Sequence, residues 1–396
     1  MNKIVGIIIT GTSGAGKTSL ALKLQEINSK FDFIKALTTR NKREDDNNHY
    51  IYLTSEEFDQ KKDSFFISTS YRKDNYAYSY DEIKKSVDSL HLPILVVSPK
   101  SISGTKTSKE KPETEEYKNL GRYMTFFIDS SDDELDKRLE KRDGEVDHEA
   151  ESKRREEDRS YSDIPDYIIQ NHNLLEAANL INRLLELHEI STELSEEDIG
   201  LYIQSGLLVN NADVNNIKGA SYDLGLGDEY YYRGEIKKLK DQHLRLTIAP
   251  YDYVLVSSKE EISLPKDVVA HFGLTVGLFC QGIILSNGQQ VDPGFRGKLF
   301  CLLFNTSNQP VTIKKGAHYA TIEFTKMNKL ASKYKGKYQG KRDIIDVLPF
   351  NAMQGGLSEL QREIEELKNE SKNMQSIYIS VIAIVFAAIS ILLIIK

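Results

Sequence analysis

Strand-like and helical patterns alternate through the first half of the chain. Residues 4–9, 93–97 and 124–128 are apolar runs of the kind that buried strands use, and residues 174–187 are apolar at helical spacing. Strands that alternate with helices indicate an α/β domain built on an open parallel sheet. We expect this domain to occupy residues 1–188.

A different pattern begins near residue 192. Short β-rich segments, separated by Gly, Asn, Asp and Pro, recur as far as residue 345. This spacing predicts an all-β sandwich or barrel over residues 192–345. Ser195 and Asp198 fit a capping box, which predicts that a helix opens this domain.

Two further patterns occupy the C-terminal part. Apolar residues fall at heptad a and d positions over residues 356–376, which fits a short coiled coil or, equally, an amphipathic surface helix. These residues are Leu357, Leu360, Ile364, Leu367 and Met374. Residues 377–395 contain no charge and no Pro, and at about 1.5 Å per residue they match the hydrocarbon core of a bilayer.

We therefore expect residues 377–395 to form a single transmembrane helix rather than a buried core helix, because no face of this segment is polar. The N-terminal apolar run is short and leads into a glycine motif, so it is not read as a signal peptide. The expected location is a membrane, with a C-terminal anchor in the lipid bilayer and the bulk of the chain in the cytoplasm.

Composition narrows the possible ligands. The net charge of -7 argues against a general nucleic-acid binder. Cys280 and Cys301 are the only cysteines, so the chain can form neither a disulfide framework nor a multi-cysteine zinc site. We expect small-molecule ligands and no nucleic acid.

One glycine-rich segment has a specific chemical meaning. It follows the first predicted strand, enters a helical pattern and matches G-x-x-x-x-G-K-[ST]. Its residues are Gly11, Thr12, Ser13, Gly14, Ala15, Gly16, Lys17 and Thr18. In such a P-loop the backbone amides surround phosphate oxygens, the lysine contacts the β- and γ-phosphates, and the hydroxyl after it can bind Mg²⁺. The segment predicts binding of ATP with Mg²⁺.

The segments after the P-loop indicate which class of P-loop protein the chain resembles. Residues 37–43 read LTTRNKR, and the chain continues to the aromatic stretch 50–53 and the acidic stretch 55–58. Together with residues 135–142 and 166–171, this order resembles guanylate kinase. The resemblance implies ATP-dependent phosphoryl transfer to a nucleotide-like acceptor.

Two sets of phosphate-binding residues follow from this resemblance. The acceptor phosphate would be held by Arg40, Arg43, Tyr50 and Tyr76. The transferring phosphoryl group would be neutralised by Lys17, Arg142 and Arg154. Phosphoryl transfer needs such cations because catalysis is mainly positioning and stabilisation of oxygen charge. The alternative for each arginine is a solvated surface charge.

The base-reading part of the resemblance is incomplete. Guanylate kinases contact guanine with acidic groups, whereas this chain has Ile67 at one expected position and Ser98 at the other. The sequence Tyr76-Ala77-Tyr78 also departs from the usual Tyr-Gly-Thr or Tyr-Gly-Ser. We expect GMP to be a poor acceptor, because the N–H donors of guanine would remain unpaired.

A second resemblance covers the β-rich region. Residues 220–227 (ASYDLGLG) and 291–297 (VDPGFRG), followed by Asn305 and Pro310, resemble the dCTP deaminase and dUTPase superfamily. The resemblance implies an all-β, dUTPase-like (β-clip) fold. It also implies a homotrimer that binds deoxynucleoside triphosphates with Mg²⁺ between subunits.

Most catalytic residues of that superfamily are missing. Its arginine–serine motif should fall at residues 274–276, where Thr275 is the only hydroxyl, and Leu302 replaces the glutamate of the deaminases. Thr321 replaces the base-contacting glutamine, and the neighbouring His318 fits a structural role. Asp292 matches the acid with which dUTPases orient water, although a turn-forming role fits equally. Asp292 and Thr275 are the candidate nucleotide site here, and we do not expect deamination.

The leading interpretation is a membrane-anchored kinase-like protein that transfers the γ-phosphate of ATP to a nucleoside monophosphate-like acceptor. Its second domain would bind a deoxynucleotide or only form the trimer. Three alternatives stay open: a non-catalytic nucleotide sensor, for example one that surveys nucleotide pools in defence, an active dUTPase- or dCTP deaminase-like enzyme, and a scaffold built from two inactive enzyme folds.

Overall fold

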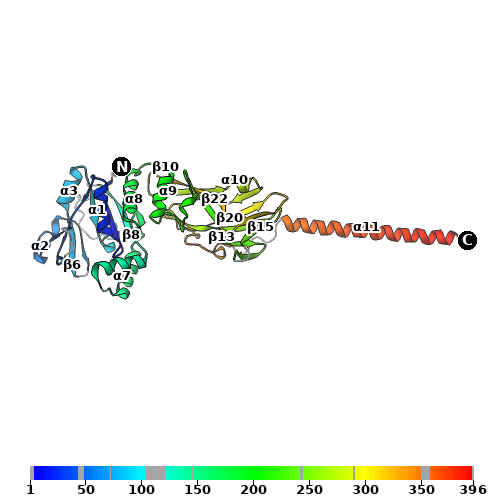
Figure 1. The fold of residues 1–396 in the computed structure, drawn as a ribbon, viewed down its shortest axis with the longest axis horizontal. Helices are drawn as coiled ribbons and strands as arrows, with labels where there is room; N and C mark the ends of the chain where they lie inside the picture. Colours follow the sequence, from blue (N-terminus) through cyan, green and yellow to red (C-terminus); the bar gives the residue numbers. More distant parts are fainter. Residues whose placement is uncertain are drawn as a thin grey trace.

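Two domains follow one another along the chain, and a long helix completes it (Figure 1). The computed structural model describes residues 4–42, 49–71, 73–102, 121–144, 146–240, 244–288, 290–348 and 357–394. Within these ranges, the side chains of residues 71, 142, 143, 357–361 and 388–394 lie outside the description.

A five-stranded parallel sheet forms the centre of the first domain. Its order is β2–β7–β1–β8–β9, with bounds Phe31–Phe33, Leu92–Val96, Ile4–Gly11, Arg122–Asp129 and Tyr167–Gln170. All of β1 is buried, because helices pack on both faces of the sheet. Ile7 and Ile9 share a core with helices α1 and α8, and Ile8 shares another core with Ile83 of helix α3. The predicted α/β domain with a parallel sheet is confirmed.

A smaller sheet and the helices complete this domain. The sheet order is β4–β3–β6–β5, with bounds Tyr50–Tyr52, Ala36–Thr38, Asp74–Ser79 and Phe65–Tyr71. The helices are α1 (Lys17–Ile27), α2 (Ser55–Gln60), η1 (Lys62–Ser64), α3 (Tyr80–Asp88), α6 (Asp132–Asp143), α7 (His148–Ser160) and α8 (Leu174–Glu186). Thr54 and Glu57 form a capping box that sets the start of α2.

The second domain is β-rich, as predicted. Its main sheet follows the path β18–β20–β16–β13–β22–β17–β19, with bounds Ile283–Ser286, Arg296–Asn305, Tyr253–Ser263, Ser221–Tyr232, His318–Lys326, Val268–Leu274 and Gln290–Val291. The side strands are β10 (Thr192–Glu193), β11 (Leu208–Asn210), β12 (Ile217–Lys218) and β14 (Glu235–Lys238), and β15 (Arg245–Ile248) pairs with β21 (Val311–Lys314).

The β domain also contains short helices. They are α9 (Glu196–Gln204), α10 (Val276–Phe279), η2 (Val214–Asn216) and η3 (Ile344–Asp346). Ser195 accepts from the Asp198 amide while the Asp198 side chain reaches back, so the predicted capping box at the start of α9 is confirmed.

The two domains are packed against each other. One hydrophobic core continues from α8 of the first domain into α9 and β17 of the second. Arg183 Nε donates to Asp198 Oδ1 at 2.7 Å across this junction, and the Gln170 amide donates to Ser205 O at 2.9 Å. Lys266 Nζ donates to the carbonyls of Asp163 and Pro165, each at 3.0 Å, so polar bonds reinforce the apolar contact.

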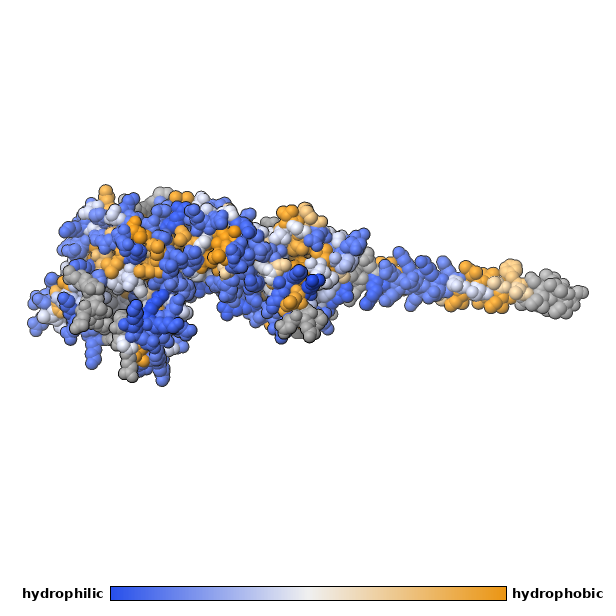
Figure 2. Space-filling view, in the orientation of Figure 1, coloured by the Kyte–Doolittle hydropathy of each residue, from blue (hydrophilic) through white to orange (hydrophobic). Residues whose placement is uncertain are grey.

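A single helix, α11, runs from Leu357 to Ile394 and extends away from the β domain (Figure 1). Figure 2 shows a polar first part and an apolar later part. Ile364, Leu367 and Met374 are exposed in this chain, and the coiled coil stays a prediction. Over the residues described, no helix is both long and apolar enough to cross a membrane. The predicted span 377–395 extends beyond them, because side chains from 388 onward lie outside the description.

Candidate active site

The P-loop connects the carboxyl end of β1 to the amino end of α1. Gly11 has φ 140°, and a Cβ there would overlap the backbone of Ile128. Gly16 precedes α1 at φ 83°, with the Asn171 side chain beside it. Both positions need glycine, because other residues rarely adopt these angles and neighbouring atoms fill the space. The positive end of the α1 dipole therefore stands at the end of the central strand, where it favours anions.

Lys17 is the first residue of α1, and its ammonium group lies back over the loop. Its Nζ donates to Gly11 O at 2.8 Å and to Thr12 O at 2.7 Å. Thr18 follows on the same helix and is half-buried. The structure thus brings these side chains to one loop. The hydroxyl oxygen of Thr18 is a ligand that suits Mg²⁺.

Two side chains from neighbouring strands hold the P-loop in place. Asn171 follows β9, and its Nδ2 donates to Ala15 O at 2.7 Å. Asp129 ends β8 and accepts from Thr12 Oγ1 at 2.9 Å. Arg159 Nε donates to the same Asp129 carboxylate at 2.9 Å, and this hydrogen bond raises the pKa of Arg159. The buried carboxylate is therefore neutralised locally while it positions the loop.

A carboxylate from helix α7 contacts the loop. The Ser13 amide donates to Asp158 Oδ2 at 3.3 Å. Burial raises the pKa of Asp158, and the charges of Lys17 and Arg154 oppose that rise. Asp158 thus competes for cationic groups that the sequence assigns to phosphate. The sequence did not point to it, because α7 carries so many charges that any one of them fits a solvated position.

We expect the substitution Asp158→Asn to strengthen ATP binding. Removing a negative charge near the phosphates is worth about 1 kcal/mol at a solvated site, or about fivefold in Kd. Protonation of Asp158 removes the same charge in the wild-type chain. The affinity of the wild-type chain for ATP should therefore approach that of the variant as the pH falls through the raised pKa of Asp158. Calorimetric titration at several pH values measures both effects. Glu156→Gln, on an exposed position of α7, is the control and should change neither.

Three of the four predicted acceptor residues come together. The Arg40 guanidinium lies 4.9 Å from the centroid of the Tyr50 ring, and the rings of Tyr50 and Tyr76 are 6.3 Å apart. Burial raises the pKa of Tyr76, so its hydroxyl remains a neutral donor at neutral pH. The fourth residue, Arg43, lies outside the described residues.

The predicted lid arginines differ in their surroundings. Arg142 lies in α6, but its side chain is outside the description. Arg154 lies in α7, pairs with Glu151 and acts on the charge of Asp158 beside the P-loop. Arg154 therefore lies one turn of α7 before Asp158, the carboxylate that contacts the P-loop.

The two base-reading positions carry no acid. Ile67 belongs to β5 and packs against an apolar cluster that includes Ile8 and Tyr78. Ser98 Oγ lies 2.7 Å from Ser101 Oγ, so the two hydroxyls hydrogen-bond to each other. Neither position offers the carboxylate with which guanylate kinases read guanine.

In the second domain, Asp292 forms the hydrogen bonds of a turn residue. Its Oδ1 accepts from Gln290 Nε2 at 2.8 Å, and its carbonyl accepts from the Phe295 amide at 3.1 Å. Strand β19 pairs Val291 with Ala270, and Thr275 lies about 16 Å further along an extended strand. One chain therefore does not bring Asp292 and Thr275 into a common site.

Thr275 lies closer to a group of polar residues on and beside strand β22. Its amide donates to Tyr319 O at 3.1 Å. On the same strand β22, Thr321 Oγ1 donates to Asp223 Oδ1 at 2.9 Å, and His318 Nδ1 lies 3.6 Å from Asp223 Oδ2. The sequence singled out these residues separately, and the sheet register joins them.

Comparison with known proteins agrees with both resemblances. Residues 3–188 match the model of the guanylate kinase family, and residues 193–327 match the dCTP deaminase-like family. A guanylate kinase from Anaplasma phagocytophilum is similar in structure, with 21% identity and a TM-score of 0.35, over 47% of this chain and 87% of that one.

Relatives of the second domain include the dCTP deaminase of Thermococcus kodakarensis, which is 36% identical over 143 residues, or 36% of this chain and 91% of the relative. The "dCTP deaminase, dUMP-forming" of Aquifex aeolicus is 28% identical, over 38% of this chain and 92% of the relative. Through residues 193–327 the chain belongs to the dCTP deaminase-like family, and a guanylate kinase domain at residues 3–188 precedes that part.

Proposed function

We propose that the first domain transfers the γ-phosphate of ATP to a nucleoside monophosphate. The observation that carries the proposal is the presence of two complementary sites in one domain. The P-loop holds Lys17 at the amino end of α1, and Arg40, Tyr50 and Tyr76 form a separate cationic and aromatic cluster. A kinase needs both, because it must hold a donor and an acceptor phosphate in line.

In this mechanism Arg40 holds the acceptor phosphate, and Tyr50 and Tyr76 orient it. An acceptor phosphate oxygen attacks the γ-phosphorus, and the bond from that phosphorus to the β–γ bridging oxygen breaks to release ADP. Lys17 and Arg154 stabilise the negative charge on the transferring group, and Arg142 is proposed to join them. Mg²⁺, held by ATP and the Thr18 hydroxyl, would supply further positive charge.

The acceptor base is proposed to differ from guanine. Guanine presents N1–H and N2–H donors, and each unpaired donor costs about 1–3 kcal/mol in a closed site. Ile67 and Ser98 provide no carboxylate for them. A monophosphate whose base lacks this pair of donors is therefore favoured over GMP.

Thermal unfolding of the protein with and without nucleotides tests this proposal. A ligand that binds the native state raises the melting temperature, and two sites should add their shifts. ATP and one monophosphate are each expected to raise the melting temperature, with a larger rise when both are present. If ATP shifts it and every monophosphate leaves it unchanged, a non-catalytic nucleotide sensor replaces the kinase. The placement of Asp158 at the P-loop favours the nucleotide sensor, because this carboxylate competes for the cations that a kinase would use on the transferring phosphoryl group.

The second domain is proposed to bind deoxynucleotides or to join three chains without catalysing deamination. Leu302 in β20 lies opposite Leu255 and Ser286 in the sheet, where deaminases are expected to carry a glutamate. An isobutyl group cannot relay a proton, so the step that releases ammonia has no acid–base group at this position.

We accordingly expect no conversion of dCTP to uracil nucleotides. Chromatography of dCTP and dUTP after incubation with the protein and Mg²⁺ measures the products, and the Thermococcus kodakarensis dCTP deaminase serves as the positive control. Uracil nucleotides forming from dCTP at a rate close to that control would contradict the expectation. Pyrophosphate released from dUTP at a comparable rate would favour the active dUTPase-like alternative.

We also propose that the chain is a homotrimer held at a membrane by residues 377–395, with its two domains in the cytoplasm. The support is the sequence: the segment is apolar on every face, and large side chains such as Ile379 and Phe386 are 68% and 67% exposed in the single chain. Membrane fractionation of the full chain tests the anchor. Mass measurement of a chain that ends before Ile377 tests the trimer.

A further inference from the structure

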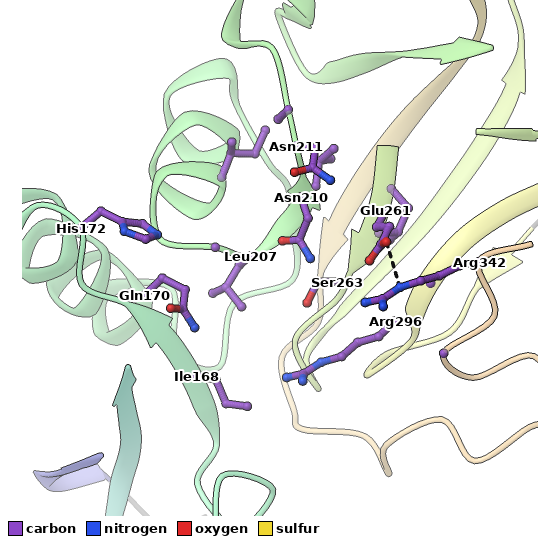
Figure 3. Close-up of a pocket in the computed structure, with 17 residues that line it drawn as sticks. Ile168, Gln170, His172, Leu207, Asn210, Asn211, Glu261, Ser263, Arg296 and Arg342 are labelled. Atoms are coloured by element: carbon purple, nitrogen blue, oxygen red, sulfur yellow. Dashed lines mark ion pairs between the residues drawn. The ribbon is translucent and has the colours of Figure 1, made fainter. Parts of the chain in front are cut away.

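A cavity of about 610 Å³ lies between the two domains (Figure 3). Its walls come from the end of β9, the connection from α9 to β11, the end of β16, the start of β20, and the segment near residue 340. None of its lining residues belongs to the P-loop or to the predicted acceptor set. A cavity of this size can hold a molecule as large as a nucleotide.

One wall carries a positive charge that points into the cavity. Figure 3 shows the Arg296 side chain extending toward Ile168 and Gln170 on the opposite wall. Its backbone is fixed on both sides, because its amide donates to Gln339 Oε1 at 3.0 Å and its carbonyl accepts from the Gly340 amide at 2.8 Å. Within the described ranges, Arg296 takes part in no ion pair.

The acidic groups near Arg296 have stronger partners than Arg296. Arg342 Nε donates to Glu261 Oε1 at 2.9 Å, so these two residues neutralise each other. The nearby Asp163 accepts from Lys333 Nζ at 2.6 Å, and this hydrogen bond, more than the charge of Arg296, lowers the pKa of Asp163. An anionic ligand would therefore meet the Arg296 guanidinium, whose fork of N–H donors suits phosphate.

The remaining polar side chains of the lining are three carboxamides, the His172 ring and the Ser263 hydroxyl. Gln170 stands on the first domain, and Asn210 and Asn211 stand on the second. Among the residues that the structure describes, these three carboxamides form no side-chain hydrogen bond, so their donors and acceptors are available to a ligand. Apolar side chains, including Ile168 and Leu207, line the space beside them. Carboxamides next to an apolar surface are suited to the edge and the face of a base.

We propose that this cavity is a second nucleotide-binding site, with the phosphates on Arg296 and the base among the carboxamides. The site is formed only where the two domains meet, so neither domain would have it alone. It is connected to the P-loop by a short stretch of chain: Gln170 lines the cavity, and the next residue, Asn171, donates to Ala15 O of the loop at 2.7 Å.

Calorimetric titration of the full chain carrying Lys17→Ala tests the proposal, because that substitution weakens the P-loop site and leaves the cavity unchanged. The probes are ATP, dCTP and inorganic tripolyphosphate. Arg296→Ala and Arg296→Glu are made in this background, since the exposed Arg296 side chain can be replaced without disturbing the core. Arg245→Ala, at an exposed position on β15 in the two-stranded β15–β21 sheet, is the matched control, and Thr275→Val reports on the family site.

We expect the Lys17→Ala chain to retain a site for ATP and dCTP in the cavity, distinct from any deoxynucleotide site that Thr275→Val reports on. Its affinity should fall about tenfold with Arg296→Ala and become unmeasurable with Arg296→Glu, and it should change less than twofold with Arg245→Ala or Thr275→Val. Unchanged melting temperatures without ligand would show that the variants are folded. The proposal is overturned if the Lys17→Ala chain binds neither ATP nor dCTP, if Arg296→Glu binds them as tightly as its parent, or if tripolyphosphate binds as tightly as both nucleotides.

Discussion

Replacing Lys17 with Ala is expected to abolish most turnover of ATP while the fold is retained. Lys17 is the cation of the P-loop, and its Nζ lies within 2.8 Å of two loop carbonyls at the amino end of α1. Loss of a group that stabilises the charge of the transferring phosphoryl costs about 3 kcal/mol, or about 100-fold in kcat/KM. Steady-state assay of ADP formation measures the effect.

Lys23→Ala is the matched control for that experiment. Lys23 lies on the same helix and pairs with Glu26 at 2.7 Å, away from the loop. Its loss should leave kcat/KM within about twofold, because Lys23 lies away from the loop, and it should cost about 0.5 kcal/mol or less in stability. Equal activity of the Lys17→Ala variant and the wild type would contradict the assignment of the P-loop.

The second large effect is expected at the junction between the domains. Asp267 and Lys326 are each 2% exposed in their side chains, and their Oδ2 and Nζ atoms are 3.0 Å apart. Tyr167 of β9 donates its hydroxyl to the same carboxylate. Burial and the negative charge of Asp267 hold the pKa of Tyr167 well above its usual value, so the phenol stays a donor.

Asp267→Ala should lower the free energy of unfolding by about 3–5 kcal/mol, because it leaves the Lys326 ammonium buried without a counter-ion. Denaturant unfolding followed by circular dichroism measures the loss. Asp228→Ala is the control: Asp228 is half-exposed and lies 3.8 Å from Lys298, so its removal should cost about 0.5 kcal/mol or less. A loss below about 1 kcal/mol for Asp267→Ala would show that the buried pair does not stabilise the junction.

Local sequence was sufficient to predict the P-loop. Gly11, Gly16 and Lys17 are contiguous with the strand and the helix that position them, so the motif contains its own structural context. The cluster of Arg40, Tyr50 and Tyr76 needed the resemblance as well, because three strands of a small sheet bring these residues together.

Residues whose roles depend on tertiary contact could not be predicted in the same way. Asp158 and Arg159 lie in a helix of almost continuous charge, and only the packing of α7 shows that one contacts the P-loop and the other neutralises Asp129. Tyr167 and Lys326 are far apart in sequence, and the segment 166–171 that carries the resemblance gives no sign that Tyr167 contacts the second domain. The cavity around Arg296 has the same origin, because its walls come from both domains.

Transfer of labelled phosphate tests the central claim most directly. The protein is incubated with ATP labelled at the γ-position, Mg²⁺ and each nucleoside monophosphate in turn, and the products are separated by thin-layer chromatography. We predict that label appears in at least one nucleoside diphosphate other than GDP, and that the Lys17→Ala variant loses this product. Label that remains in ATP with every acceptor, while the protein still binds ATP, would contradict phosphoryl transfer by this domain.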